Sequence, residues 1–177
     1  MSKLIKIALL GGECTGKTTL CKQLTLHYGA HTVNEVARRY ISELQEAYSE
    51  SDLWQIAVQQ QEEEKKIAKV ANRLLFCDTS LEVIKVWSEH SYGGCHRNIL
   101  NQIAKETYDA YFIMKPDLPW KYDVQREHPL QKDREYFYRI YLDIAIHSNI
   151  PFVIIQGVNE VRLSSAISFI EKMLHAK

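Results

Sequence analysis

The chain has 177 residues, a length that suits one domain spanning residues 1–177. Its 22 lysines and arginines balance 22 aspartates and glutamates, and this zero net charge argues against a nucleic-acid-binding surface and favours a small-molecule partner. No apolar run is long enough to cross a membrane and the four cysteines form no C-x-x-C pair, so we expect no membrane partner and free thiols, as in a cytoplasmic protein.

The first predicted element is a buried strand, Lys6–Leu10, that leads directly into a glycine-rich loop. Residues 11–18, GGECTGKT, fit the phosphate-binding pattern G-x-x-x-x-G-K-[ST]. Backbone N–H groups of such a loop surround phosphate oxygens, its lysine reaches the terminal phosphates, its hydroxyl binds Mg²⁺, and the helix that follows adds a positive N-terminal end. We therefore predict a nucleoside triphosphate site, with Thr18 as a metal ligand, formed by Gly11, Gly12, Glu13, Cys14, Thr15, Gly16, Lys17, Thr18 and Thr19.

A short second strand, Thr32–Asn34, precedes the sequence EVARRY of residues 35–40. Glu35 and Arg38 would share a helix face at i, i+3 spacing, where they are candidates to bind a hydroxylated or charged acceptor. The alternative for these two residues is a surface ion pair. The pattern is then helical from Asp52 to Ala71, with Ser51 or Asp52 as N-cap.

The third predicted strand, Leu74–Cys77, ends at Asp78. Ligands of open α/β sheets bind at the carboxyl ends of the strands, so Asp78 is a candidate to hold Mg²⁺ through water or to accept the proton of an acceptor hydroxyl. The alternative is that Asp78 caps a helix that starts at Thr79 or Ser80. No D-x-x-G segment follows this strand, which argues against a GTP-hydrolysing switch.

A fourth strand, Ala110–Met114, is followed by a proline-rich segment with little periodicity. We interpret residues 115–134 as a mobile lid, because long loops in compact domains are often functional and the basic residues of this one suit a triphosphate. The alternative is a solvated connection. Helices over Glu135–His147 and Asn159–His175 flank a fifth strand, Phe152–Ile155.

The alternation of apolar runs and helical patterns predicts an α/β protein with a P-loop NTP hydrolase fold, in which a five-stranded parallel sheet has helices on both faces and a lid segment. A kinase for a small acceptor needs a carboxylate near the transferred phosphoryl group, acceptor-binding residues and a closing lid. The sequence has candidates for all three, so we favour a kinase over a hydrolysing switch or a motor-like ATPase. The non-enzyme alternative is a regulatory ATP-binding module without turnover.

Six segments together resemble the ribosylnicotinamide kinase domain of NadR-type proteins, within the P-loop nucleoside-kinase-like group. They are GGECTGKTTL, EVARRY, FCDTS, Tyr92-Gly93, YDAYFIM and PWKYDVQR, and they extend over nearly the whole chain. The order of the phosphate loop, E-x-x-R, D-T and P-W-x-x-D-x-x-R is much more specific than the loop alone. Such proteins commonly carry an adenylyltransferase domain with an H-x-G-H signature, which is not present in these residues, so the resemblance implies a stand-alone kinase.

The resemblance implies Mg²⁺-dependent transfer of the terminal phosphoryl group of ATP to the 5′-hydroxyl of nicotinamide riboside, which gives nicotinamide mononucleotide. It implies that the acceptor site and lid are lined by Glu35, Arg38, Asp78, Trp120, Asp123 and Arg126. The candidate catalytic residues are then Lys17, Asp78, Arg126 and Glu35, and the candidate metal ligands are Thr18 and Asp78. Trp120 would attract the cationic ring by roughly 0.5–2 kcal/mol, or else it packs inward and anchors the lid. Val124-Gln125 departs from a glycine in the family pattern, which leaves another nucleoside or nucleotide open as the acceptor.

Overall fold

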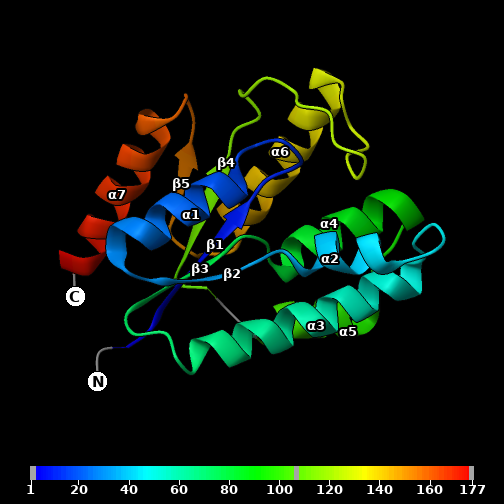
Figure 1. Ribbon diagram of the computed structural model, residues 1–177, viewed down its shortest axis with the longest axis horizontal. Coiled ribbons are helices and arrows are strands. Elements are labelled where there is room, and N and C mark those ends of the chain that lie inside the picture. Colours follow the sequence, from blue (N-terminus) through cyan, green and yellow to red (C-terminus); the bar gives the residue numbers. More distant parts are fainter. Residues whose placement is uncertain (1–2, 106–107, 176–177) are drawn as a thin grey trace.

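The computed structural model describes residues 3–105 and 108–175, in which strands and helices alternate (Figure 1). The strands are β1 (Ile5–Leu10), β2 (His31–Val33), β3 (Leu74–Cys77), β4 (Ala110–Met114) and β5 (Phe152–Ile155). The helices are α1 (Lys17–Tyr28), α2 (Val36–Glu43), α3 (Glu50–Ala68), α4 (Leu81–Tyr92), α5 (Arg97–Ile103), α6 (Gln131–His147) and α7 (Glu160–His175). No helix in the described ranges is both long and apolar enough to span a bilayer.

The five strands form one parallel sheet in the order β2-β3-β1-β4-β5. This arrangement confirms the predicted α/β fold. β1 is central, and the chain leaves it toward β2 and β3 on one side and toward β4 and β5 on the other. The segments that follow β1, β3 and β4 therefore meet at one edge of the sheet, at the switch point where ligands of such sheets bind.

Helices cover both faces of the sheet. Because successive side chains of a strand point to opposite faces, the strands contribute residues to two separate apolar clusters. Ile7 and Leu9 of β1 belong to a core cluster with Leu24 of α1 and Ile170 of α7. The intervening residues Ala8 and Leu10 belong to a second cluster, which includes Phe137 and Tyr141 of α6. β1, β3 and β4 are thereby largely kept from water on both faces, which explains why these three strands are continuous apolar runs rather than alternating ones.

A third apolar cluster lies among helices rather than against the sheet. It contains Leu53 and Ile56 of α3, Ile84 of α4 and Ile99 of α5. Figure 1 shows α2, α3, α4 and α5 grouped together beside the carboxyl end of the sheet. This group supplies one wall of the site described below.

Several element boundaries differ from the predictions. α3 begins at Glu50, because Ser49 is its N-cap and the Ser49 N–H donates to the Asp52 carboxylate at 2.7 Å in a capping box. α6 begins at Gln131, so the predicted helix start at Glu135 is wrong, and we keep the name lid for the non-helical residues 115–130 of the predicted segment. The seven-residue helix α5 was not predicted at all.

Candidate active site

The phosphate loop joins β1 to α1, and its shape depends on residues in unusual conformations. Cys14 and Gly16 have positive φ angles of 56° and 83°. A Cβ atom added at Gly11 would lie 2.8 Å from the Cβ of Met114, so no larger residue fits there without a shift of β4. The Thr15 hydroxyl donates to the carbonyl of Gly12 at 2.8 Å and closes the loop on itself.

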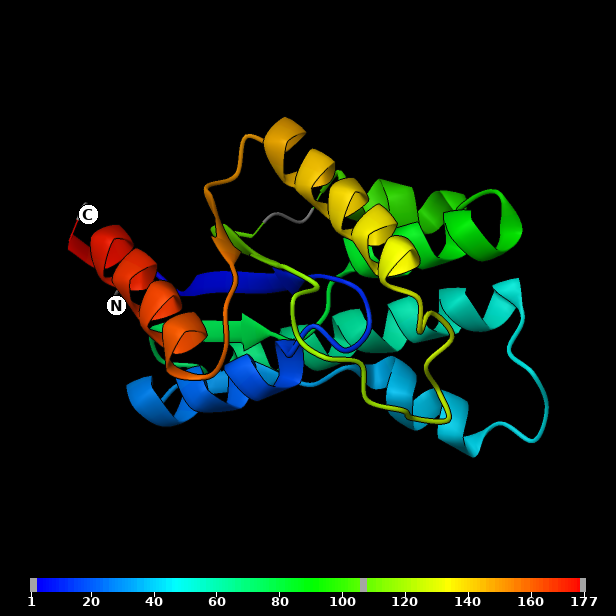
Figure 2. The ribbon, with the colours of Figure 1, turned by 90° about the horizontal axis from the view of Figure 1, so that it is seen from above.

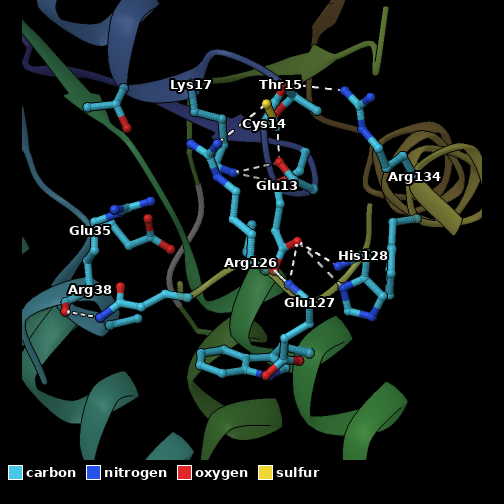
Figure 3. A pocket seen from close by; sticks show the side chains of 18 of the residues that line it. Glu13, Cys14, Thr15, Lys17, Glu35, Arg38, Arg126, Glu127, His128 and Arg134 are labelled. Atoms are coloured by element: carbon cyan, nitrogen blue, oxygen red, sulfur yellow. Dashed lines mark hydrogen bonds and ion pairs between the residues drawn. The ribbon is translucent and has the colours of Figure 1, made fainter. Parts of the chain in front are cut away.

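Lys17 lies at the start of α1 with its ammonium group against the loop. Its Nζ donates to the carbonyl oxygens of Gly11 at 2.8 Å and Gly12 at 3.0 Å. The same residue lines the cavity, where Figure 3 shows it near Cys14 and Thr15. A flexible ammonium held by neutral carbonyls can move to a phosphate oxygen, which is a stronger, charge-assisted partner.

A cavity of about 650 Å³ opens in front of the loop. The segments that surround it are the phosphate loop, one side of α2, one side of α4, the lid and one side of α6. Among the predicted site residues, the cavity is lined by Gly11, Gly12, Glu13, Cys14, Thr15, Gly16, Lys17, Thr18, Thr19, Glu35, Arg38 and Arg126. The volume is in the range usual for sites that enclose a small molecule.

We predicted that Glu35 and Arg38 lie in the same helix. In the structure α2 begins one residue later, at Val36, and Glu35 is its N-cap. Both side chains nevertheless line the cavity. Burial raises the pKa of the Glu35 carboxyl, and the charges of Asp78 and Glu13 add to this effect while Lys17 and Arg38 oppose it. A carboxylate with a raised pKa is a suitable proton acceptor near neutral pH.

Asp78 follows β3 and is 2% exposed. Its Oδ1 atom has no hydrogen-bond partner among the described residues. The N-cap of α4 is Ser80, so Asp78 does not cap that helix. A buried carboxylate oxygen without a partner fits a role toward a hydrated cation or a hydroxyl group.

The donor set of the loop and β3 fits Mg²⁺ rather than a transition metal. Thr18, in the first turn of α1, and Asp78 offer oxygen atoms, which Mg²⁺ prefers, and Mg²⁺ takes its other ligands from phosphates and water. Within the described ranges no three His, Cys, Asp or Glu side chains are grouped so as to hold a metal. The site thus suits a cation that arrives with its nucleotide.

The lid is attached to the phosphate loop mainly through its main chain. Figure 2 shows residues 115–130 passing the phosphate loop, reaching α2 and returning to α6. The Glu13 carboxylate accepts the N–H groups of Glu127 and His128, each at 3.0 Å (Figure 3). Cys14 Sγ accepts the N–H of Lys121 at 3.2 Å. Arg126 lies 3.6 Å from the same sulfur. Loop and lid therefore form one wall of the cavity.

Three predicted site residues, Asp78, Trp120 and Asp123, are not among those that line the cavity. The guanidinium groups of Arg126 and Arg134 each lie over the Trp120 ring, 5.8 Å from its centre. Asp123 pairs with Arg38 at 2.9 Å and so connects the lid to α2. The hydrogen bond from the Gln125 N–H, and then Arg38, lower the pKa of the Asp123 carboxyl.

Sequence reasoning missed the aromatic wall of the cavity, formed by Tyr48, Trp87 and His90. Trp87 Nε1 donates to the Tyr48 hydroxyl at 3.0 Å, and this hydroxyl donates to Glu127 at 3.0 Å. The rings of Tyr48 and Trp87 pack edge to face, with their centroids 4.9 Å apart. The only sequence signal was the i, i+3 spacing of Trp87 and His90, which places them on one face of α4.

Comparison with known proteins identifies the family. A family model described as an AAA domain matches residues 6–162, and the chain belongs to this family. The trifunctional NAD biosynthesis/regulator protein NadR of Salmonella typhimurium is 24% identical over an alignment of 175 residues, which covers 95% of this chain and 42% of NadR. The chain thus spans less than half the length of this relative.

Solved structures show the same fold. Two structures of NadR, one in complex with NR and one with NAD and AMP-PNP, have TM-scores of 0.72 and 0.70 at 18% and 19% identity. Each covers 96% of this chain, which matches 51% and 49% of the NadR chains. Thymidylate kinase from Ehrlichia chaffeensis has a TM-score of 0.60 at 20% identity, with 96% of this chain and 98% of that chain covered. The chain has a P-loop kinase fold, and it matches NadR in sequence and in structure.

Proposed function

We propose that this AAA-domain protein is an ATP-dependent kinase that phosphorylates the 5′-hydroxyl of nicotinamide riboside to give nicotinamide mononucleotide. The observation that carries the proposal is that a single cavity joins the phosphate loop to a wall of aromatic and acidic side chains. The terminal phosphoryl group of ATP and the acceptor hydroxyl would meet between these two ends. Mg²⁺ bound with the nucleotide would neutralise charge on the phosphates, with Thr18 and Asp78 as the residues that hold it.

The nucleotide half of the proposal rests on the phosphate loop. Lys17 is placed to follow the transferred phosphoryl group, and the loop amides suit the remaining phosphates. Arg126, on the lid beside Cys14, would add positive charge to the same group when the lid is closed. The NadR structure with AMP-PNP, an ATP analogue, supports ATP as the donor.

The acceptor half rests on the wall opposite the loop. Nicotinamide riboside has a cationic ring, which the face of Trp87 and the carboxylate of Glu127 would attract. Glu35 would accept the hydroxyl proton. Arg38 already pairs with the Asp123 carboxylate, which favours a nucleoside over an acceptor that carries its own phosphate.

The NadR structure in complex with NR, which we interpret as nicotinamide riboside, supports the choice of acceptor. We further propose that the one domain of residues 1–177 holds the complete kinase site. The four cysteines are free thiols, which suits a reducing compartment, and we therefore place the reaction in the cytoplasm.

The test is ADP release by the purified full chain with Mg-ATP and one acceptor at a time. The panel comprises nicotinamide riboside, adenosine, cytidine, uridine, thymidine, thymidine monophosphate and a blank without acceptor. We expect stimulation by nicotinamide riboside alone, with nicotinamide mononucleotide as the product. If another compound stimulates ADP release instead, the protein is a kinase with a different substrate. If no compound raises ADP release above the blank although ATP binds, the protein is a regulatory ATP-binding module.

A Lys17→Ala variant is the control for the site itself. Because Lys17 would compensate the charge of the transferred group, the folded variant should lose nearly all phosphoryl transfer. Lys22, further along α1, offers a matched control, since Lys22→Ala removes the same charge from the exposed side of the helix. Full turnover in folded Lys17→Ala would contradict the assignment of the site.

A further inference from the structure

Two buried arginines that are not among the predicted site residues contact the phosphate loop, and one of them, Arg134, also lines the cavity. Arg134 of α6 and Arg162 of α7 are each 4% exposed, although arginine is rarely buried. Their guanidinium groups donate mainly to main-chain carbonyls, which carry no full charge. Such a placement is costly for stability, so it calls for a reason in the site.

Each arginine joins one carbonyl of the phosphate loop to one carbonyl of the lid stem, which we define as residues 115–118. Arg134 donates to Cys14 O at 3.3 Å and to Leu118 O at 3.0 Å. Arg162 donates to Thr15 O at 2.6 Å and to Lys115 O at 2.9 Å. Two consecutive peptides of the loop are therefore held by two different helices.

The direction of a carbonyl determines the direction of the next amide. In a planar trans peptide the C=O of one residue and the N–H of the following residue point in opposite directions, and no described peptide is cis. Fixing Cys14 O therefore fixes the N–H of Thr15, and fixing Thr15 O fixes that of Gly16. We propose that Arg134 and Arg162 are positioning residues that turn the Thr15 and Gly16 amides toward the nucleotide phosphates.

Both arginines are themselves held in place. Arg162 Nε donates to Gly157 O at 2.7 Å, and its guanidinium pairs with Asp117, whose carboxylate accepts the Gly157 N–H at 2.7 Å. Arg134 donates to the Gln131 side chain at 3.1 Å and lies over the Trp120 ring. Guanidinium groups fixed in this way define the carbonyl directions more sharply than flexible ammonium groups would.

The proposal is tested with Arg134→Lys and Arg162→Lys in the full chain. Lysine keeps the positive charge of arginine but lacks the planar guanidinium that can donate to two carbonyls at once. The variants' binding of Mg-tripolyphosphate, Mg-ATP and adenosine is measured by calorimetry, with Arg139→Lys on the exposed side of α6 as the matched control. We expect tripolyphosphate and ATP to bind about 10- to 100-fold more weakly to the two variants, adenosine to bind as before, and Arg139→Lys to be unchanged. A purely structural role would weaken all three ligands together.

Unchanged tripolyphosphate affinity in the folded variants, or an equal loss for adenosine, would overturn the proposal. Should a variant not fold, ¹⁵N NMR of the unmodified protein decides: the Thr15 and Gly16 amides should move most on addition of tripolyphosphate, and unmoved amides would refute the proposed role. The inference rests on the proposed function only in that phosphates bind the loop. If no acceptor stimulated ADP release, the proposed kinase activity would be refuted, but the phosphate-binding results would be unaffected. The failure of the proposed function can therefore be distinguished from the failure of this inference.

Discussion

The Arg38 guanidinium lies 2.9 Å from the Asp123 carboxylate, 85 residues further along the chain. This ion pair connects the first turn of α2, where Arg38 lines the cavity, with the lid. An Asp123→Asn substitution should loosen the lid and raise the KM for the acceptor several-fold, with little change in the KM for ATP. Because the Arg38 side chain is half exposed, the loss of folding stability should be below about 1 kcal/mol.

The same pair predicts a pH dependence of the lid. The pKa of Asp123 is lowered in the folded protein, first by the Gln125 N–H and then by Arg38. Its contribution to stability is thus complete above the ordinary aspartate pKa and is lost as the pH falls through the lowered one. Protease sensitivity of the lid should rise over this acidic range in the unmodified protein, and Asp123→Asn should show no such step. Asp143→Asn, on an exposed part of α6, is the matched control and should behave like the unmodified protein.

Glu35→Gln should lower turnover strongly and yet increase stability. The pKa of Glu35 is raised by burial, so the folded state favours its protonated form, and stability falls as the pH rises from the ordinary carboxyl pKa through the raised one. Glutamine resembles that protonated form. The variant should therefore melt at a higher temperature than the unmodified protein at neutral pH and at the same temperature in acid, whereas Glu43→Gln at the exposed end of α2 should change neither quantity.

Asp78→Asn should raise the Mg²⁺ concentration needed for half-maximal turnover and lower kcat, without loss of stability. Its Oδ1 has no partner to lose within the described part of the chain, and Ser80, not Asp78, caps α4. The measurement combines an Mg²⁺ titration with thermal melting. Asp52→Asn, in the capping box of α3, should do the opposite and lower stability while turnover persists. A destabilised Asp78→Asn protein with normal Mg²⁺ dependence would return Asp78 to a structural role.

Trp87→Leu should raise the KM for the acceptor, because the ring lies in the cavity wall beside Tyr48. Trp120→Leu should instead disturb the lid and affect kcat, since its ring contacts Arg126 and Arg134 rather than the cavity. Steady-state kinetics of both variants separate the two roles, with Trp54→Leu, which packs on His96 in the helical layer, as a control. An acceptor KM that responds to Trp120 and not to Trp87 would restore the interpretation made from the resemblance.

The parts of the fold that were predictable from sequence are those with local signals. β1, β3 and β4 are buried on both faces and therefore read as continuous apolar runs. The phosphate loop was recognisable because its glycines and lysine have a fixed spacing. α5 was missed because seven residues give too few turns for a helical period to be distinct.

The parts of the site that were not predictable depend on contacts between distant segments. Trp87 has the spacing of an ordinary core residue of α4, and only the packing of α4 beside the lid places it in the cavity. Arg162 contacts Thr15 across 147 positions, and no local pattern marks such a pair. For Trp120 the motif left open whether the ring contacts the acceptor or anchors the lid, and the contacts of the ring with Arg126 and Arg134 depend on the folded lid and α6.

The attachment of the lid through peptide groups has a consequence for how this protein can diverge. Glu13 and Cys14 bind N–H groups of residues 121, 127 and 128, which every amino acid except proline provides. Mutations that change lid side chains such as the exposed Tyr122 and Val124 therefore leave these anchoring bonds in place. The lid can accumulate substitutions, in evolution or in a designed library, that would alter the acceptor of the proposed kinase while the phosphate loop stays intact.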